Sequence, residues 1–324
     1  MPDISKINAL AIGSVSKVDG LAKASILDID GVAVPPAIAA PAAAYSVRLL
    51  GSGVGVPTYT GAAMRVRRDT AGGTGDDDEA DIAFDSGVIS LDSAISNASA
   101  GVTATTLGQF LNVGTVGGTT YTNPDSLTGT AIAYIPEWKD QSGNNANATQ
   151  SVHSLQRRIH NGTTDADLQQ SNGQPTLFAS SGGGFEVSLP QLTTPFCSMV
   201  FDRNNNDFTT WTPRNSAWMA LGDSSTSTTV TSTMGTLTAY KNGSQMTITT
   251  RAQFATDIGS DQLLFTHTTT QAQQASTWKF ATYYTNNTAF NIKPSLQENI
   301  MWGTDQSDNR TGIESDINGF FGIY

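Results

Sequence analysis

The sequence is poor in charged residues and contains a single cysteine. Only 14% of its 324 residues are Asp, Glu, Lys or Arg, and 38% are hydrophobic. A helical bundle would need more Leu, Glu and Lys than this chain has. The lone Cys197 excludes an intrachain disulfide and a cysteine-based zinc site. We expect it to be a small, buried, apolar residue.

Basic residues are also scarce, and the sequence lacks long apolar runs. Lys and Arg total 17 against 28 Asp and Glu, which gives a formal net charge of −11. Such a chain repels nucleic acid and anionic lipid, so we expect neither as a partner. No stretch approaches the roughly 20 apolar residues of a membrane span. The first residues, MPDISKINALAIG, lack the basic and apolar segments of a signal peptide. We therefore expect synthesis in the cytoplasm and no membrane insertion.

The residues that are abundant favour short strands joined by turns. Alternating apolar segments predict strands, separated by turn residues at the intervals of a β-sandwich. These candidates are 45–50, 62–67, 81–84, 129–135, 198–201, 218–221, 245–250, 278–284 and 297–302. Residues 106–111 suggest one turn of helix. Ile313, Ile317, Phe320 and Phe321 recur at helical spacing, which predicts a short C-terminal helix packed on the sandwich.

The first 36 residues form three aligned blocks of eleven, starting at Ile4, Val15 and Ile26. Each block has a second β-branched residue three positions later, namely Ile7, Val18 and Ile29. A turn pair follows, and Asp-Gly between β-branched residues is a strong hairpin signal. Units this small cannot bury a face alone, so we expect them to stack on each other or on another chain. The alternative is a loosely ordered tail with accidental similarity.

These features divide the chain into three parts. Residues 1–36 are predicted to be a small β-repeat arm for anchoring or oligomerisation, residues 37–44 a Pro/Ala linker, and residues 45–324 the sandwich. An arm joined to a body suggests an attachment device carrying a working domain.

Several motifs of the body occur in an order that resembles a known family. They are AYSVRLL from Ala44, YTGAAMRVRRDT from Tyr59, DIAFDSGVISLDS from Asp81, LGQFL from Leu107, WKDQSGNNANATQ from Trp138 and QPTL from Gln174. Together they resemble the catalytic domain of α-L-arabinofuranosidase B, a concanavalin/laminin-G-like, jelly-roll β-sandwich that also occurs in bacteriophage virion proteins. The last 28 residues resemble the closing strand and helix of such phage proteins. Residues 178–296 match nothing recognisable.

The WKDQSGN segment is the most specific of these motifs. Asp140, Ser142 and Asn144 can bond nearby backbone N–H groups, and Gly143 can supply a positive-φ turn. This favours a loop that satisfies its own hydrogen bonds. The alternative is a glycan-binding rim, with Trp138 as a stacking face and Asp140, Gln141 and Asn144 as hydrogen-bonding groups.

The catalytic residues of the family do not carry over. The resemblance implies two adjacent cysteines, then an aromatic-Asp segment and a nucleophilic Glu, whereas Cys197 stands alone with no Glu nearby. We therefore predict no catalytic residue. His153, His160 and His267 lack metal-ligand spacing and are expected on the surface or in loops. We expect Arg65, Arg67 and Arg68 to form one of a pair of exposed loops and to be partly neutralised by the second, the acidic segment 75–81. That loop, with Asp76, Asp77, Asp78 and Asp81, is a weak Ca²⁺ candidate, and no other cofactor is expected.

The sequence thus predicts a structural component of a bacteriophage particle, released by lysis and assembled as a homo-oligomer. Residues 1–36 would contact other virion proteins. The sandwich would bind a host-surface glycan, as in a tail fibre or spike, or decorate the capsid. The alternatives are a diverged glycoside hydrolase acting on arabinose-containing or host-surface polysaccharide, and a structural component without a ligand.

Overall fold

The structure is a computed structural model that describes residues 17–18, 21–22, 28–29, 32–33, 36–179, 183–203, 211–213, 236–270, 277–280 and 294–324. The predicted strand at 218–221 and the first arm block, with Ile4 and Ile7, lie outside these residues. So do Val15 and Ile26. Among the residues described, no helix is long and apolar enough to span a membrane.

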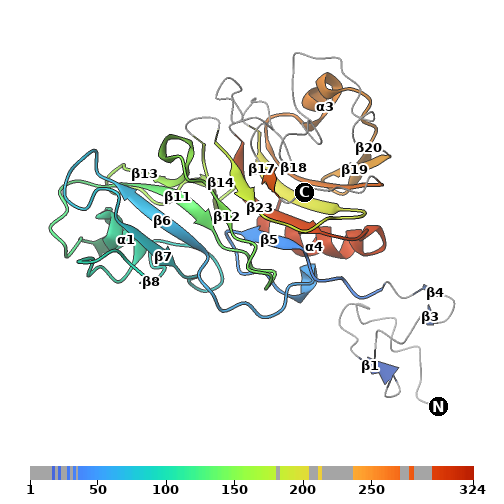
Figure 1. The fold of residues 1–324 in the computed structure, drawn as a ribbon, viewed down its shortest axis with the longest axis horizontal. Helices are drawn as coiled ribbons and strands as arrows, with labels where there is room; N and C mark the ends of the chain where they lie inside the picture. Colours follow the sequence, from blue (N-terminus) through green and yellow to red (C-terminus); the bar gives the residue numbers. More distant parts are fainter. Residues whose placement is uncertain are drawn as a thin grey trace.

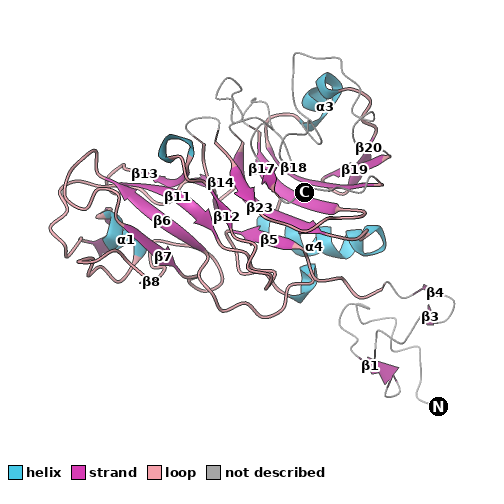
Figure 2. Ribbon diagram, in the orientation of Figure 1, coloured by secondary structure: helices cyan, strands magenta, loops and turns pink. Residues whose placement is uncertain are grey.

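Two antiparallel sheets make up the body (Figure 2). The larger sheet has nine strands in the order β18-β22-β16-β12-β11-β6-β7-β8, and β13 also pairs with β11. Its strands are β6 (Met64–Asp69), β7 (Glu79–Ile82), β8 (Ile95–Ser96), β11 (Ile132–Trp138), β12 (Ala148–Thr149), β13 (Arg157–Asn161), β16 (Phe185–Val187), β18 (Trp211–Pro213) and β22 (Trp278–Phe280).

The smaller sheet has six strands in the order β20-β19-β21-β17-β23-β5. They are β5 (Ala43–Ser46), β17 (Phe196–Asp202), β19 (Leu237–Lys241), β20 (Ser244–Met246), β21 (Gln262–Thr269) and β23 (Ser295–Trp302). Within the body, short hairpins outside both sheets are formed by β9 (Gly114–Val116) with β10 (Thr119–Tyr121) and by β14 (Gln170–Ser171) with β15 (Gln174–Pro175).

Apolar side chains from both sheets meet in one core. Tyr45 of β5 stacks on Phe280 of β22 at 5.2 Å between ring centroids and lies 5.8 Å from Trp138 of β11. Cys197 is fully buried in the same core, and burial raises the pKa of its thiol well above the ordinary value. The predicted all-β jelly-roll sandwich is therefore confirmed, as is the buried, apolar environment of Cys197.

Helices lie at the margins of the sandwich (Figure 1). The C-terminal helix α4 (Arg310–Phe321) buries Ile313, Ile317 and Phe321 as predicted, while Phe320 is partly buried against the core. The predicted turn of helix is α1 (Leu107–Leu111), which Thr106 caps by accepting a hydrogen bond from the Gln109 N–H. Short 3₁₀ turns occur at Ser52–Val54, His153–Leu155 and Ser307–Asn309.

Several elements differ from the prediction. The predicted strand at 245–250 ends at Met246, and α3 (Arg251–Ile258) follows, capped by the Thr250 hydroxyl. β13, β19 and β21 were missed because their apolar residues run together or are interrupted by Arg, His and Thr. In β21, residues on both faces are buried, so the alternation that marks a half-exposed strand is absent.

The second and third blocks of the arm each contain a hairpin. β1 (Lys17–Val18) pairs with β2 (Leu21–Ala22), and β3 (Asp28–Ile29) pairs with β4 (Val32–Ala33). In each case the strands flank an Asp-Gly pair, as the sequence predicts, and Val18 and Ile29 lie in these strands.

The predicted linker, residues 37–44, is part of the body rather than a free connection. Ile38, Ala39 and Ala42 pack against the core, and Ala43 and Ala44 are fully buried. The Ala39 carbonyl accepts a hydrogen bond from the indole N–H of Trp302. The sandwich therefore begins several residues before position 45.

Candidate functional site

Asp140 fixes the loop that follows β11. Its Oδ1 accepts hydrogen bonds from the backbone N–H groups of Ala44 and Ser142, both at 2.9 Å. Its Oδ2 accepts from the Ser142 hydroxyl at 2.7 Å and from the Ala146 N–H at 3.0 Å. Because Ala44 belongs to β5 of the smaller sheet, this carboxylate joins the two sheets. Only 3% of Asp140 is exposed, so it presents no acceptor to a ligand.

Gln141 and Trp138 extend the same connection. The Gln141 side chain accepts from the Leu50 N–H at 2.8 Å and donates to the carbonyls of Ser46 and Arg48. Trp138 is fully buried and directs its indole N–H towards the Ser46 carbonyl. The predicted glycan rim is therefore wrong for Trp138, Asp140 and Gln141, and the self-satisfied loop is correct.

A bulge in β11 explains why Trp138 faces inward. Tyr134 pairs with Arg67 and Glu137 with Arg65, so three steps along β11 match two along β6. The extra residue falls between Tyr134 and Glu137, in the stretch that contains Pro136, and it reverses the alternation beyond it. The remaining rim candidate, Asn144, is exposed, and its Nδ2 donates to the carbonyls of Pro41 and Ala42.

The four aspartates of the Ca²⁺ candidate point to separate partners. Asp77 pairs with Arg67, Asp78 with Arg68 and Asp81 with Arg65, whereas Asp76 accepts hydrogen bonds from the backbone of residues 70 and 72. Within the described ranges, no group of three or more His, Cys, Asp or Glu side chains is arranged to hold a metal ion. The acidic loop instead balances the arginines of β6.

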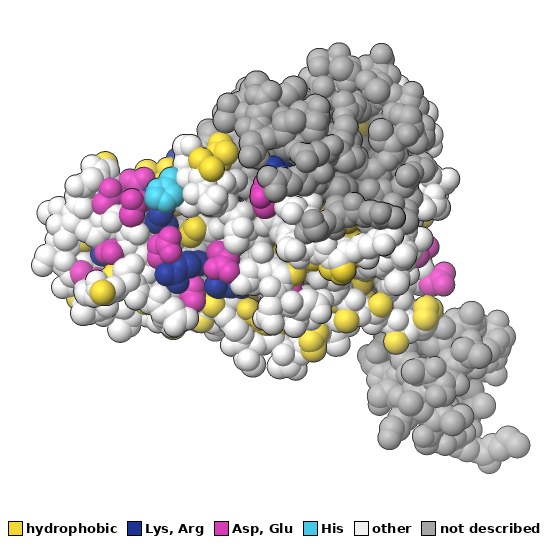
Figure 3. All heavy atoms as spheres, viewed as in Figure 1, with side chains coloured by type: hydrophobic (Ala, Val, Ile, Leu, Met, Phe, Trp, Pro, Cys, Tyr) yellow, Lys and Arg dark blue, Asp and Glu magenta, His cyan; other side chains and the backbone are white. Residues whose placement is uncertain are grey.

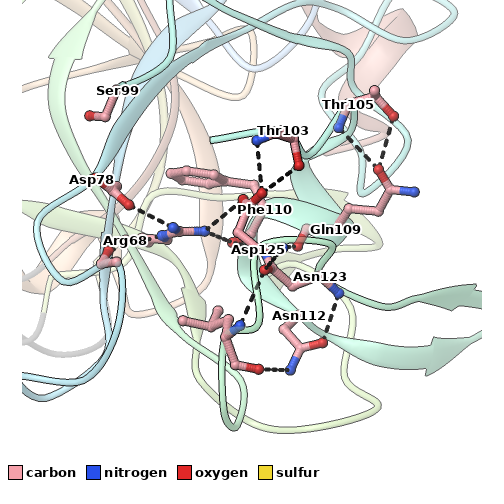
Figure 4. A network of polar contacts seen from close by, with 12 residues as sticks. Arg68, Asp78, Ser99, Thr103, Thr105, Gln109, Phe110, Asn112, Asn123 and Asp125 are labelled. Carbon is pink, nitrogen blue, oxygen red and sulfur yellow. Dashed lines mark hydrogen bonds and ion pairs between the residues drawn. The ribbon is translucent and has the colours of Figure 1, made fainter. Parts of the chain in front are cut away.

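Two of these arginines are buried, which corrects the prediction of an exposed pair of loops. Arg68 crosses from β6 to Asp78 and to the Phe110 carbonyl, with its guanidinium 4.7 Å from the Phe110 ring centroid (Figure 4). Burial alone raises the pKa of the neighbouring Asp125, but hydrogen bonds from Thr103 and the charge of Arg68 outweigh it and lower that pKa. This network holds α1 and the following loop against β6.

The histidines, like these arginines, include both exposed and buried residues. His153 is exposed in a 3₁₀ turn, as predicted, with its ring nitrogen 3.6 Å from Asp77. His160 of β13 and His267 of β21 are fully buried, so their predicted surface positions are wrong. Burial lowers the pKa of both rings, that of His267 to about 3.

The solvent-facing side of the nine-stranded sheet carries a row of polar side chains. Register pairs connect one residue from each of six strands in this row, in the order Asp81, Arg65, Glu137, Thr149, Glu186 and Lys279. Figure 3 shows acidic and basic side chains intermixed over β6, β7 and β11. We call this side of the sheet, directed away from the six-stranded sheet, the outer face.

Five charged side chains in and beside this row lie closest together, and we call them the outer cluster: Arg65, Glu79, Asp81, Glu137 and Lys139. Arg65 donates to Glu79 and, at 3.1 Å, to Asp81. Lys139 bonds Glu137 at 2.8 Å and lies 3.7 Å from Asp81. Every member except Asp81 has 18–30% of its side chain exposed. These side chains are therefore accessible to solvent, while their ion-pair partners fix their positions.

Two amides and an aromatic ring border the outer cluster. Asn97 donates to Asp81 at 2.8 Å, and Asn147 donates to Glu137 at 2.6 Å. Tyr59 packs edge-on against Phe84, and burial together with nearby carboxylates raises the pKa of its hydroxyl to about 12. Sequence reasoning named Asp81 as a Ca²⁺ candidate and Arg65 as one of its neutralising partners, but it did not predict a glycan site on this face. The only available signal was the alternation of Arg65 and Arg67 with apolar residues along β6.

Every glutamate of the chain has a basic partner. Glu79, Glu137 and Glu186 pair on the outer face with Arg65, Lys139 and Lys279, whereas the buried Glu298 and Glu314 pair with Arg48 and Arg310. Burial raises the pKa of Glu314 above its usual range, but that side chain lies on the buried side of α4 and is only 2% exposed.

Comparisons with known proteins give fold-level likeness only. No protein-family model matches the sequence, and no curated protein matches it. Similar solved structures include a GH54 α-L-arabinofuranosidase soaked with a cyclic sulfate inhibitor, at a TM-score of 0.44 and 12% identity. A second is an arabinofuranosidase complexed with arabinofuranosyl-α-1,2-xylobiose, at 0.41 and 13%. Each match covers 86% of this chain and 62% of the other, so the chain spans less than two thirds of those proteins. Values this low carry no assignment of activity.

Proposed function

We propose that this chain is a component of a bacteriophage particle, attached through residues 1–36, and that its sandwich binds a host-surface glycan through the outer face. The observation that carries the binding role is the outer cluster. Its carboxylates, cations and amides are held by one another yet remain partly exposed, so little side-chain freedom is lost when a ligand binds.

The chemistry of the outer cluster suits a polyhydroxylated ligand. Carboxylate oxygens accept hydrogen bonds from hydroxyl groups, while Arg, Lys and Asn donate to hydroxyl oxygens. Three carboxylates stand beside two cations, so the surface offers acceptors and donors within one small area. Anionic polymers are disfavoured, because the chain as a whole carries a formal charge of −11.

The surroundings of the glutamates on the outer face favour a role in binding over a role in hydrolysis. A glycosidase needs one carboxyl group that is protonated near neutral pH and a second that attacks or activates water. Each of the three glutamates on the outer face is already engaged in an ion pair with Arg or Lys, which suits a fixed hydrogen-bonding surface.

The attachment role is supported by the repeated arm and by the motifs that resemble phage virion proteins. Two arm blocks form two-residue hairpins, and units of this size need neighbours to bury their side chains. A homo-oligomer, in which several arms associate, supplies such neighbours.

Two measurements test these roles separately. An antibody against the sandwich should place gold on purified particles, and removal of residues 1–36 should abolish assembly onto them. On a glycan array, the intact chain should bind a limited set of glycans, and Arg65→Ala should weaken this binding about tenfold by releasing the outer cluster. Lys241→Ala, on β19 of the other sheet, is the matched control.

The outcomes separate the hypotheses. Gold at tail tips with glycan binding supports host recognition, whereas gold over the head without glycan binding favours capsid decoration. The virion role is overturned if no gold appears on particles. Release of reducing sugar from a bound glycan would favour the alternative of a diverged glycoside hydrolase.

A further inference from the structure

A pocket of about 250 Å³ opens at the end of the outer face. It lies where β6 and β13 end and β11, between them, begins. Register pairing places Asp69 and Asn161 on either side of Ile132, so these three residues form one row across three strands. Thr70 and Thr130 are among the residues that line the walls.

The backbone around the pocket is held in one geometry. His160 accepts a hydrogen bond at Nδ1 from the Gly162 N–H, 3.1 Å away, and its Nε2 lies 3.1 Å from the Ala166 carbonyl. Gly162 has a φ of +78°, and a Cβ at this position would lie 3.0 Å from the Ile132 side chain. The glycine therefore allows the rim to pass close to the pocket floor. Thr130 is fixed by its bonds to Asn112 and Thr164.

The polar groups on the two sides of Ile132 complement each other. Asp69 accepts a hydrogen bond at Oδ1 from the Ala71 N–H at 3.0 Å, and its Oδ2 lies 3.8 Å from the Arg67 guanidinium. Because 34% of the side chain is exposed, acceptor sites remain on both oxygens. The Oδ1 of Asn161 accepts from the Thr163 N–H. Within the described part of the chain, no hydrogen bond uses its Nδ2, which remains available as a donor. A carboxylate acceptor and an amide donor thus stand on either side of a partly exposed apolar side chain.

We propose that this pocket binds one neutral sugar ring at the end of a glycan. Asp69 would accept hydrogen bonds from two neighbouring hydroxyl groups, Asn161 would donate to a ring substituent, and the C–H face of the ring would pack on Ile132. The volume is slightly below the roughly 300–1,000 Å³ of sites for drug-sized ligands, which fits a single ring. Asp69 disfavours an anionic ligand. This inference rests on the proposed glycan-binding function and names the part of the outer face that receives the glycan terminus.

The test follows the δ1-methyl group of Ile132 by NMR in the full-length chain. The probes are methyl α-D-mannoside, methyl α-L-rhamnoside, methyl β-D-galactoside and methyl β-D-glucoside, each titrated separately. We expect at least one of them to shift the Ile132 signal saturably, while the buried Ile300 and Ile313 signals stay unchanged. Asp69→Asn and Asn161→Ala should each weaken the binding about tenfold or more, because each removes a hydrogen bond to the sugar.

Asp261→Asn is the matched control, because Asp261 lines a separate hollow of about 360 Å³ beside Gln262 and should leave the titration unchanged. The inference is overturned if no probe moves the Ile132 signal, or if Asp69→Asn and the wild-type chain respond equally. Glycan-array binding that persists in both pocket variants would leave the proposed function standing and remove the pocket from it. A saturable Ile132 shift without any binding to the array or to particles would leave the sugar pocket standing and overturn the proposed function.

Discussion

The two sheets carry ion pairs of similar composition in opposite environments. Beneath α4, Arg48 bonds Glu298 and Asp316, and both Arg48 and Glu298 are almost completely buried. On the other sheet, Arg65 bonds Glu79 and Asp81 with about a quarter of its side chain exposed. The buried set connects the segment that follows β5 to β23 and to the C-terminal helix, whereas the exposed set connects only adjacent strands. The same residue types therefore stabilise the fold in one place and remain available to a ligand in the other.

Removing the buried partner should have the largest effect. Burial lowers the pKa of the Arg48 guanidinium, but Glu298 and Asp316 raise it above its ordinary value, so the cation depends on both carboxylates. Glu298→Ala would leave this charge with one half-exposed partner. We expect the free energy of unfolding to fall by about 3 kcal/mol or more, as denaturant titration would measure. A loss below 1 kcal/mol would contradict the stabilising role.

The Asp140 loop tests whether a carboxylate can join the two sheets. Asp140→Ala would remove the acceptor of four hydrogen bonds and leave the buried Ala44 N–H without a partner. We expect a loss of about 2–3 kcal/mol in the free energy of unfolding. Asn144→Ala is the control in the same loop, because Asn144 is exposed and should change stability by less than about 1 kcal/mol.

This loop also shows how far the sequence leads. Turn residues and Asx-type bonding predicted correctly that the Asp140 side chain would accept hydrogen bonds from nearby backbone N–H groups, because these interactions are local. The inward direction of Trp138 was not predictable, since it depends on a bulge defined by pairing with β6. The sandwich and α4 followed from periodicity. The Arg48–Glu298 pair did not, because its members are 250 positions apart and meet only through strand pairing.

The buried histidine of β21 predicts a pH dependence. Burial lowers the pKa of His267 to about 3, against an ordinary value of about 6.5 in the unfolded chain. The unfolded state therefore binds more protons in this range, and stability is lost as the pH falls below about 6.5. We expect a loss of about 2 kcal/mol between pH 6.5 and 5. His267→Leu should flatten this dependence, and an unchanged slope in that variant would assign the titration to other groups.

The smallest stability effect is expected on the outer face. Glu79→Gln removes one charge from a pair in which both side chains are more than a quarter exposed, so the free energy of unfolding should change by less than about 1 kcal/mol. Glycan binding should nevertheless fall, because Arg65 loses the carboxylate that orients it. Parallel unfolding and glycan-array measurements on this one variant distinguish the two roles. If stability falls by as much as in Glu298→Ala while binding is unchanged, the outer cluster belongs to the scaffold and not to a binding surface.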